Sequence, residues 1–240
     1  MKLHEYTQTD STNEEARRYA AAGGEVPALF IAEEQSAGRG RMGRSFFSPS
    51  RTGLYTSLLI KAPADTSRML SLTAIAAVAA TDAIKERFGI ELDIKWVNDL
   101  YLDSKKVSGV LAESFVFEGE RFVVIGIGIN LCTEQFPDEL LKKAGSLAPS
   151  LHLDRDQKRE LAIDIAQKMI TLIDSASLVS TMQKYRLRSC VIGKRITFTI
   201  DGKQLQATAL DINDNGSLSV ELGDGTRMEL SSGEISIFFD

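Results

Sequence analysis

The stretch Lys106-Val-Ser-Gly-Val-Leu-Ala-Glu-Ser-Phe-Val-Phe-Glu-Gly-Glu-Arg-Phe-Val-Val-Ile-Gly-Ile-Gly-Ile-Asn130 contains two apolar segments rich in β-branched residues. The segments 106–117 and 121–130 are joined through Glu118-Gly-Glu120, a short connection that contains glycine. Two apolar runs joined in this way are typical of a β-hairpin. The stretch therefore predicts a long antiparallel strand pair.

Two glycines interrupt the second predicted strand. Gly126 and Gly128 occupy alternate positions and should therefore lie on the same face of that strand. Glycine weakens a strand, so its presence there indicates that another group must approach this face closely. The run is not a nucleotide-binding fingerprint, because no helical pattern follows it immediately.

Further strands and helices are expected on both sides of the hairpin. Apolar runs predict strands at 28–32, 53–60 and 92–96. Helical patterns cover 67–88, about 156–173 and a further stretch up to 188. Such a mixture indicates an α+β domain with a mixed β-sheet and helices packed mainly on one face.

A helix is also expected close to the start of the chain. The segment Asp10-Ser-Thr-Asn-Glu-Glu15 offers a capping box, formed by Ser11 with Glu14 or by Thr12 with Glu15. The helix should continue through Ala22 and end at the following glycines. Helix capping is thus a sufficient explanation for these polar residues, although a capped helix can also hold a polar ligand with its free amides.

The sequence changes in character after Cys190. Apolar and polar residues alternate, and turn dipeptides recur at Asp201-Gly202, Asn215-Gly216, Asp224-Gly225 and Ser232-Gly233. Tight turns at such intervals predict a small, closed antiparallel β-barrel of about fifty residues. We therefore divide the chain into residues 1–189 and residues 190–240.

Composition narrows the possible functions. The chain has 240 residues, a net charge of -5, two cysteines and two histidines. The few cysteines and histidines favour a reducing cytoplasm and exclude a metal centre built from them. There is no secretory signal and no apolar run of about 18 residues, so we expect a cytoplasmic protein without a membrane span. The acidic balance argues against general nucleic-acid binding.

The segment Gly38-Arg-Gly-Arg-Met-Gly-Arg-Ser-Phe-Phe-Ser-Pro-Ser-Arg51, here called the arginine loop, has four arginines and no acidic residue. Its glycines let the backbone approach a ligand closely, and guanidinium groups bind carboxylates and phosphates through paired hydrogen bonds. The loop therefore suits an enzyme that brings two anions together. A solvated basic loop or an RNA-binding arginine–glycine segment is the alternative.

A second polar cluster is Lys95-Trp-Val-Asn-Asp-Leu-Tyr-Leu102, followed by Lys106 at the start of the long hairpin. Lysine, asparagine and aspartate at strand ends can be presented to a ligand, and the Lys106 ammonium could face bound anions. Alternatively, Lys95 and Lys106 protect a strand edge, and Asn98-Asp99 is only a turn. Trp96 is expected in the core.

These motifs together resemble those of the biotin–protein ligases, in the same order along the chain. The similarity rests on Asp10-Ser-Thr-Asn13, Gln35, Gly38-Arg-Gly-Arg-Met-Gly-Arg44, Lys95-Trp-Val-Asn-Asp99, Lys106-Val-Ser-Gly-Val-Leu-Ala-Glu113, Gly126-Ile-Gly-Ile-Asn130 and the C-terminal Gly233-Glu-Ile-Ser236. Val97 stands where the family usually has proline, and Met42 where it often has arginine. The resemblance implies a catalytic domain followed by a small SH3-like β-barrel.

The resemblance also implies a reaction: ATP activates biotin as biotinoyl-5′-AMP, which then biotinylates a lysine of a carboxylase's biotin carboxyl carrier domain. The residues implied in biotin binding are Ser11, Thr12, Asn13, Gln35, Arg39, Gly40, Arg41 and Lys106. Those implied in ATP binding are Arg44, Phe46, Asn98 and Asn130, with Phe46 covering the adenine.

Charge accounts for the residues expected in catalysis. The biotin carboxylate must attack the α-phosphate of ATP, and Arg39, Arg41 and Lys106 would neutralise both anions. Asp99 could orient the acceptor amine or help to bind Mg²⁺ with the phosphates. His152, Cys132 and Cys190 receive no role.

Several alternatives remain. We expect a monofunctional enzyme that does not bind DNA, because the first helix leaves no room before it for a reader domain; a homodimer is possible. A lipoate or octanoyl ligase or transferase of the same fold should have a Ser-Gly-Gly turn after an arginine pair, or a reactive cysteine, and we find no such turn. A small RNA-binding protein is opposed by the acidic composition.

The arginine loop generates a first prediction. Ordering a loop costs roughly 1–2 kcal/mol per residue in backbone entropy, and mutual repulsion of its arginines adds to this without a bound anion. We therefore expect trypsin to cut rapidly between residues 39 and 51 in the free protein, and binding of biotin and MgATP to protect these sites by closing the loop. Cleavage elsewhere in the chain serves as the internal control. Equal cleavage with and without ligands would contradict a closing loop.

Overall fold

The computed structural model describes residues 1–63, 69–174, 178–200 and 202–237. Its helices are α1 (Thr12–Ala21), the short 3₁₀ turn η1 (Arg41–Gly43), α2 (Met69–Phe88), α3 (Arg155–Asp174) and α4 (Leu178–Leu187). The strands of the larger sheet are β1 (Lys2–Tyr6), β2 (Ala28–Ala32), β3 (Gly53–Lys61), β4 (Asp93–Lys95), β5 (Asp99–Leu102), β6 (Lys105–Phe117) and β7 (Glu120–Asn130). Those of the smaller sheet are β8 (Arg195–Ile200), β9 (Lys203–Ile212), β10 (Leu218–Leu222), β11 (Arg227–Leu230) and β12 (Ile235–Ile237).

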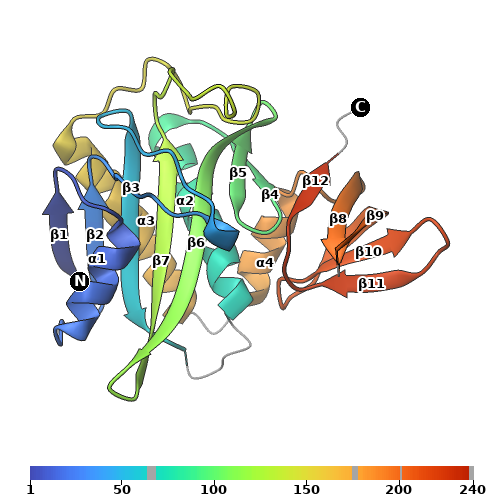
Figure 1. The fold of residues 1–240 in the computed structure, drawn as a ribbon, viewed down its shortest axis with the longest axis horizontal. Coiled ribbons are helices and arrows are strands. Elements are labelled where there is room, and N and C mark those ends of the chain that lie inside the picture. The colour runs from blue at the N-terminus through green and yellow to red at the C-terminus, as the bar shows by residue number, and fades with distance from the viewer. Residues whose placement is uncertain (64–68, 175–177, 201, 238–240) are drawn as a thin grey trace.

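The predicted hairpin is confirmed and forms the middle of the larger sheet (Figure 1). The strand order is β1-β2-β3-β7-β6-β5-β4, with β1 parallel to β2 and the other neighbours antiparallel. Glu118 and Gly119 make the turn with φ angles of 49° and 82°, and at the second position glycine adopts this angle without strain. The mixed α+β sheet is thus as predicted, while strands β1 and β5 were not predicted.

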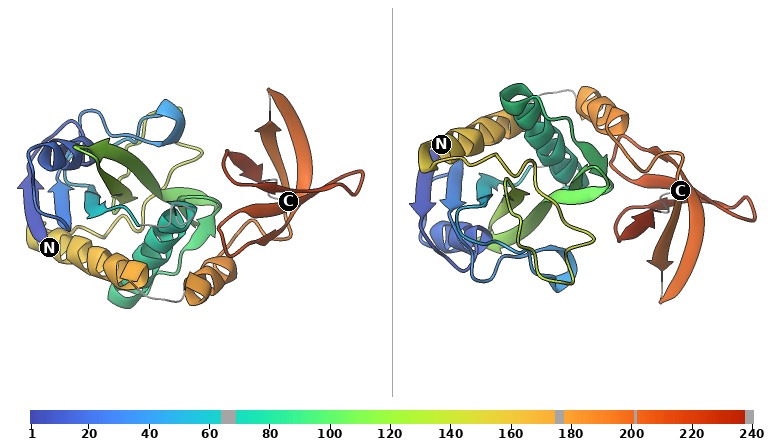
Figure 2. Two further views of the ribbon diagram at one scale, coloured as in Figure 1. Left: turned by 90° about the horizontal axis from the view of Figure 1, so that it is seen from below. Right: turned by 90° about the horizontal axis from the view of Figure 1, so that it is seen from above.

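Helices cover both faces of this sheet unequally. Helix α1 packs on β2, β3 and β7, whereas α2 and α3 pack on the opposite face (Figures 1 and 2). Helix α2 packs closely on its neighbours because many of its buried positions are alanine; these are Ala74, Ala76, Ala77, Ala79, Ala80 and Ala83. The predicted start of this helix at residue 67 lies outside the described residues. No helix in the described part of the chain is long and apolar enough to cross a membrane.

The capping box predicted at the start of α1 is wrong. Ser11 occupies the N-cap position but its side chain makes no capping hydrogen bond. Glu15 instead accepts a hydrogen bond from Thr9 (Oγ1 to Oε1, 2.6 Å), and Glu14 pairs with Arg39. Distant polar groups compete successfully with the local cap, since each carboxylate finds a partner outside the first helical turn.

The smaller sheet follows the order β11-β10-β9-β8-β12 and is antiparallel throughout. Gly216, Gly225 and Gly233 have positive φ angles, as the predicted turns require; Asp201 lies outside the described residues. The barrel was expected to be closed. In the described residues no strand pairing joins β11 to β12, which are the two ends of the sheet order.

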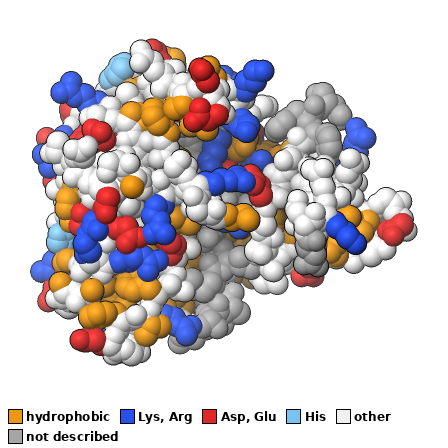
Figure 3. All heavy atoms as spheres, in the orientation of Figure 1, with side chains coloured by type: hydrophobic (Ala, Val, Ile, Leu, Met, Phe, Trp, Pro, Cys, Tyr) orange, Lys and Arg blue, Asp and Glu red, His pale blue; other side chains and the backbone are white. Residues whose placement is uncertain are grey.

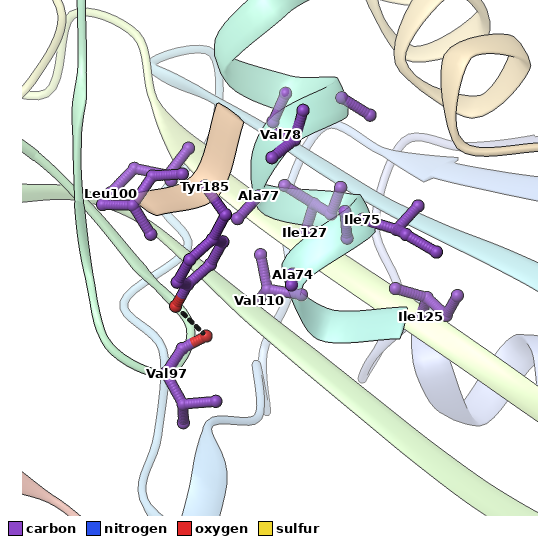
Figure 4. Packing of buried hydrophobic residues seen from close by; sticks show 14 of the residues in the cluster. Ala74, Ile75, Ala77, Val78, Val97, Leu100, Val110, Ile125, Ile127 and Tyr185 are labelled. Atoms are coloured by element: carbon purple, nitrogen blue, oxygen red, sulfur yellow. Dashed lines mark hydrogen bonds between the residues drawn. The ribbon is translucent and has the colours of Figure 1, made fainter. Parts of the chain in front are cut away.

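Two buried aromatic side chains fix the turn between β4 and β5. Tyr185 of α4 donates a hydrogen bond from Oη to the carbonyl oxygen of Val97 at 3.0 Å (Figure 4). Trp96 donates from Nε1 to the carbonyl oxygen of Gly216 at 2.9 Å, which joins this turn to the smaller sheet. Burial raises the pKa of the Tyr185 phenol, so its hydroxyl remains a donor. Trp96 belongs to the core, as predicted.

The contact of Tyr185 with Val97 can be tested by stability. Tyr185→Phe leaves a buried carbonyl without its donor, and we expect it to lower the free energy of unfolding by about 1–3 kcal/mol. Urea unfolding followed by circular dichroism measures the change. The control is Tyr19→Phe, at a less buried tyrosine, for which we expect less than about 0.5 kcal/mol. Equal unfolding midpoints for Tyr185→Phe and the unmodified protein would contradict the assignment.

Candidate functional site

A cavity of about 130 Å³ opens between α1, the arginine loop, strands β6 and β7, the turn before β5 and the start of β12. Figure 3 shows basic and acidic side chains gathered where the larger body meets the C-terminal strands. Most of the residues that the sequence suggested for a site line this one cavity; they are Ser11, Thr12, Asn13, Gln35, Arg39, Gly40, Arg41, Arg44, Phe46, Asn98, Asp99 and Lys106.

Asn130 is the exception among the suggested residues. It is the last residue of β7 and does not belong to the cavity lining. Its side chain is buried and donates from Nδ2 to the carbonyl oxygen of Gly145 at 2.9 Å. In this structure Asn130 therefore holds a neighbouring loop beside the cavity.

One end of the cavity is lined by neutral polar groups held in a fixed network. Gln35 takes over the capping of α1, because its Oε1 accepts hydrogen bonds from the backbone nitrogen of Thr12 at 2.9 Å and from Thr12 Oγ1 at 3.1 Å. The other end of the Gln35 amide donates from Nε2 to Ser48 Oγ at 3.0 Å. The orientation of this amide is thereby determined from both sides.

Two residues that the sequence did not single out hold Thr12 and Asn13 in place. Ser57 Oγ, in the middle of β3, lies 2.7 Å from both Thr12 Oγ1 and Asn13 Oδ1. Glu113 accepts a hydrogen bond from Asn13 Nδ2 at 2.9 Å. Ser57 gave no signal because it resembles any polar residue within a strand, whereas Glu113 stood at the end of a quoted motif.

The floor of the cavity is the nearly bare backbone of β6 and β7. A Cβ atom added at Gly126 would lie 2.3 Å from Asn13 Oδ1, and one added at Gly128 would lie 2.5 Å from the Phe46 ring. Gly109 pairs with Gly128 across the two strands. The prediction of a close approach is confirmed, and the groups that approach are the side chains of Asn13 and Phe46.

The arginine loop folds into a tight turn over this floor. The backbone nitrogen of Gly40 donates to the carbonyl oxygen of Arg44 at 2.7 Å, and that of Phe46 donates to the carbonyl oxygen of Gly38 at 2.8 Å. Met42 and Gly43 turn the chain with φ angles of 55° and 74°. Of the loop arginines, Arg39, Arg41 and Arg44 line the cavity.

Carboxylates balance several cations at the charged end of the cavity. Arg39 pairs with Glu14, Arg44 pairs with Glu234, and Lys106 pairs with Asp99 (Nζ to Oδ1, 2.7 Å). Repulsion among the loop arginines, which we expected from the sequence, is therefore offset by acidic groups from other segments. These partners lie far away in sequence, so the local composition of the loop gave no sign of them.

Arg41 lies in a different environment. Its Nη1 donates to Asn98 Oδ1 at 3.2 Å, and Asn98 in turn donates from Nδ2 to the carbonyl oxygen of Val110 at 2.7 Å. Burial lowers the pKa of the Arg41 guanidinium, with nearby Asp99 and Glu234 acting in the opposite direction. The group remains charged, because the ordinary pKa of arginine is far above neutrality.

The cavity also includes residues that sequence reasoning did not assign to a site. Lys95 lines it from the end of β4 and Trp96 from the turn that follows. Gly233, Glu234 and Ile235 line it from the C-terminal part of the chain. Their only sequence signal was their place in the quoted motifs. Asp99 and Glu234 are its acidic lining residues, and the described part of the chain contains no cluster of metal-ligating side chains.

Comparison with known proteins gives matches for both parts of the chain. Residues 5–130 match the biotin/lipoate A/B protein ligase family, and residues 191–237 match the biotin protein ligase C terminal domain. The biotin--[acetyl-CoA-carboxylase] ligase of Mycobacterium tuberculosis is 30% identical over 248 residues, covering 98% of this chain and 88% of that protein.

Two further relatives show the range of the similarity. The bifunctional ligase/repressor BirA of Bacillus subtilis is 40% identical over 141 residues, and this match spans only 43% of its length. The structure of the biotin protein ligase from Aquifex aeolicus in complex with biotin and ATP superposes with a TM-score of 0.83 at 25% identity, covering 100% of this chain and 99% of that one. By sequence and by fold, the chain belongs to the biotin/lipoate A/B protein ligase family.

Proposed function

We propose that this protein is an ATP-dependent biotin–protein ligase. It would activate biotin as biotinoyl-5′-AMP and transfer the biotinoyl group to a lysine of a biotin carboxyl carrier domain, such as that of acetyl-CoA carboxylase. The proposal rests mainly on one observation: a single cavity has neutral hydrogen-bonding groups at one end and cationic groups at the other. The family match and the ligands named for the Aquifex aeolicus relative support it.

The neutral end suits the ureido ring of biotin. This ring presents a carbonyl oxygen and two N–H groups, which require both donors and acceptors from the protein. Thr12 and Asn13 are already oriented by Ser57 and Glu113, and the Gln35 amide is oriented by Thr12 and Ser48; together they supply hydroxyl and amide groups. Because these groups are fixed before biotin binds, little side-chain entropy is lost on binding.

The cationic end suits the activation step. A carboxylate oxygen of biotin forms a bond to the α-phosphorus of ATP, while the bond from that phosphorus to the bridging oxygen breaks and its electron pair leaves with pyrophosphate. Arg39, Arg41 and Lys106 would reduce the repulsion between the two anions and stabilise the charge of the transition state. Asp99 pairs with Lys106, and we propose that it positions the lysine ammonium.

ATP would extend from this end, with Arg44 and Asn98 near the phosphates and Phe46 against the adenine. The Phe46 ring lies so close to Gly128 that a Cβ there would be 2.5 Å from it, and Tyr55 packs against Phe46 edge-on with ring centroids 6.4 Å apart. Asn130 would act indirectly, through the loop that it holds. We keep the division into residues 1–189 and 190–240, with Glu234 as a contribution of the second part to the site.

Magnesium fits this cavity as a companion of the phosphates. The acidic lining residues are Asp99 and Glu234, and each already faces a cation. Mg²⁺ is commonly held by one or two carboxylates together with substrate phosphates and water. We propose that phosphate oxygens and water supply most of its ligands here, with Asp99 as the nearest protein carboxylate. The ion would reduce the charge of the phosphates when bound.

Pyrophosphate exchange into ATP, measured with biotin, lipoate and octanoate in parallel, tests the proposal. We expect exchange that depends on biotin, followed by transfer to a purified carrier domain. Exchange that occurs with lipoate or octanoate but not with biotin would contradict the proposal and would indicate a lipoate or octanoyl ligase of the same fold. Absence of exchange together with tight RNA binding would indicate the unrelated function considered from the sequence.

A further prediction concerns the charged groups at the reacting atoms. We expect Lys106→Ala and Arg41→Ala each to reduce adenylate formation by about 10²–10³-fold, because one preorganised charge is lost from the transition state. The fold should persist, since neither side chain is part of the apolar core. Lys61→Ala, at an exposed lysine that pairs with Glu120, is the control. Exchange rates equal to that control would contradict the assigned roles.

The glycine floor gives another prediction. Gly128→Ala would place a methyl group 2.5 Å from the Phe46 ring, so the ring must move. Overpacking of this kind costs about 1–3 kcal/mol, and we expect a loss of roughly tenfold or more in kcat/KM for ATP. The control is Gly223→Ala, where no atom lies within 4 Å of the added Cβ. Unchanged ATP kinetics in Gly128→Ala would show that Phe46 does not bind the nucleotide.

A further inference from the structure

Lys95 lines the cavity but has no role in the reaction as proposed above. It is the last residue of β4, at one edge of the larger sheet, and it is partly buried. Its Nζ lies 3.4 Å from Tyr101 Oη and 5.4 Å from the centre of the Tyr101 ring. These contacts hold the ammonium at the cavity without neutralising its charge.

Lys95 shares with Arg41 the lack of a directly paired carboxylate, unlike the other cations of the cavity lining. Arg39, Arg44 and Lys106 each have a carboxylate within 4.0 Å, whereas no carboxylate of the described residues lies so close to Lys95. Burial lowers the pKa of the Lys95 ammonium, and Asp99 and Glu234 oppose this from a greater distance. A partly desolvated cation without a direct counter-ion has a high affinity for an anionic ligand.

Protection of a sheet edge does not account for this lysine. The backbone of the linker after α4 already covers the edge of β4, because the nitrogen of Ile94 donates to the carbonyl oxygen of Arg188 at 2.7 Å and its carbonyl oxygen accepts from Cys190 at 3.1 Å. Strand pairing with another chain is therefore blocked at Ile94. The position of the ammonium in the cavity lining needs another explanation.

The order of the strands indicates which part of a ligand would meet Lys95. From the neutral end outward, the cavity passes β7 with its glycines, β6 with Lys106, β5 with Asp99 and finally β4 with Lys95. Lys95 and Asp99 are direct cross-strand partners. Since neighbouring strands are about 4.8 Å apart, β4 lies roughly 10 Å beyond β6. Lys106 is thus nearest to the reacting carboxylate and α-phosphate, and Lys95 lies further out.

We infer that Lys95 binds the pyrophosphate portion of ATP and stabilises it as the leaving group. This inference rests on the proposed function. As the bond between the α-phosphorus and the bridging oxygen breaks, negative charge accumulates on the departing pyrophosphate. The Lys95 ammonium would stabilise this charge electrostatically. No proton transfer is needed. Lys95 acts on the first half-reaction, and the later transfer of the biotinoyl group to lysine does not involve it.

Separate assays of the two half-reactions test the assignment. In Lys95→Met we expect the KM for pyrophosphate in the exchange reaction to rise, and kcat/KM for ATP to fall, each on the order of 10- to 100-fold. Transfer from chemically prepared biotinoyl-5′-AMP to the carrier domain should stay within about twofold of the unmodified protein. Lys95→Arg should recover part of the pyrophosphate affinity, because it keeps the positive charge.

The control is Lys105→Met, which removes the same charge from an exposed lysine outside the cavity lining. Pyrophosphate and ATP parameters in Lys95→Met equal to this control would overturn the inference. An equal loss in transfer from biotinoyl-5′-AMP would also overturn it, since the role would then be structural. Thermal unfolding of both variants identifies a loss of fold, and Lys95→Gln replaces the methionine variant if needed.

A direct binding measurement separates this inference from the proposed function. Titration of inorganic pyrophosphate with Mg²⁺ into the free protein, followed by calorimetry, requires no acid substrate. Weaker binding by Lys95→Met than by Lys105→Met supports the inference even if exchange proves to depend on lipoate. Equal binding by the two variants contradicts it, whichever acid the enzyme activates.

Discussion

The close approach of Asn13 and Phe46 to the bare backbone of β7 is the constraint on which the rest of the site depends. Gly126 and Gly128 leave no side chain between the sheet and these two groups. Helix α1 and the arginine loop can therefore both lie close to the same sheet face, one at each side of the cavity. A side chain at Gly126 would displace Asn13, and one at Gly128 would displace Phe46.

The elements that depend on local pattern could be predicted from the sequence. The long hairpin, the mixed sheet and most helices followed from apolar periodicity and turn residues, and the motifs suggested nearly all residues that line the cavity. Strands β1 and β5 were missed because they are short and only partly buried, so that their pattern is weak. The β6–β7 turn was predictable because it needs glycine at one position.

The errors have a common physical origin in contacts between distant segments. The capping box failed because Gln35 and Thr9 supplied partners that the local sequence does not contain. Ser57 and Glu234 were not recognised, since their importance comes only from the groups that meet them in the folded chain. Asn130 stood in a quoted motif, but its side chain bonds to Gly145 outside the cavity. Charge pairs across a fold cannot be deduced from composition alone.

The position of Gly233–Ile235 in the cavity lining affects when the site forms during synthesis of the chain. A ribosome releases the chain from the N-terminus, so α1, the arginine loop and the central hairpin can assemble while the C-terminal strands are still inside the exit tunnel. The site then lacks one wall, and Arg44 lacks Glu234. The wall is completed only when Gly233–Ile235 have emerged. A nascent chain that has not yet released these residues consequently holds a site without this wall.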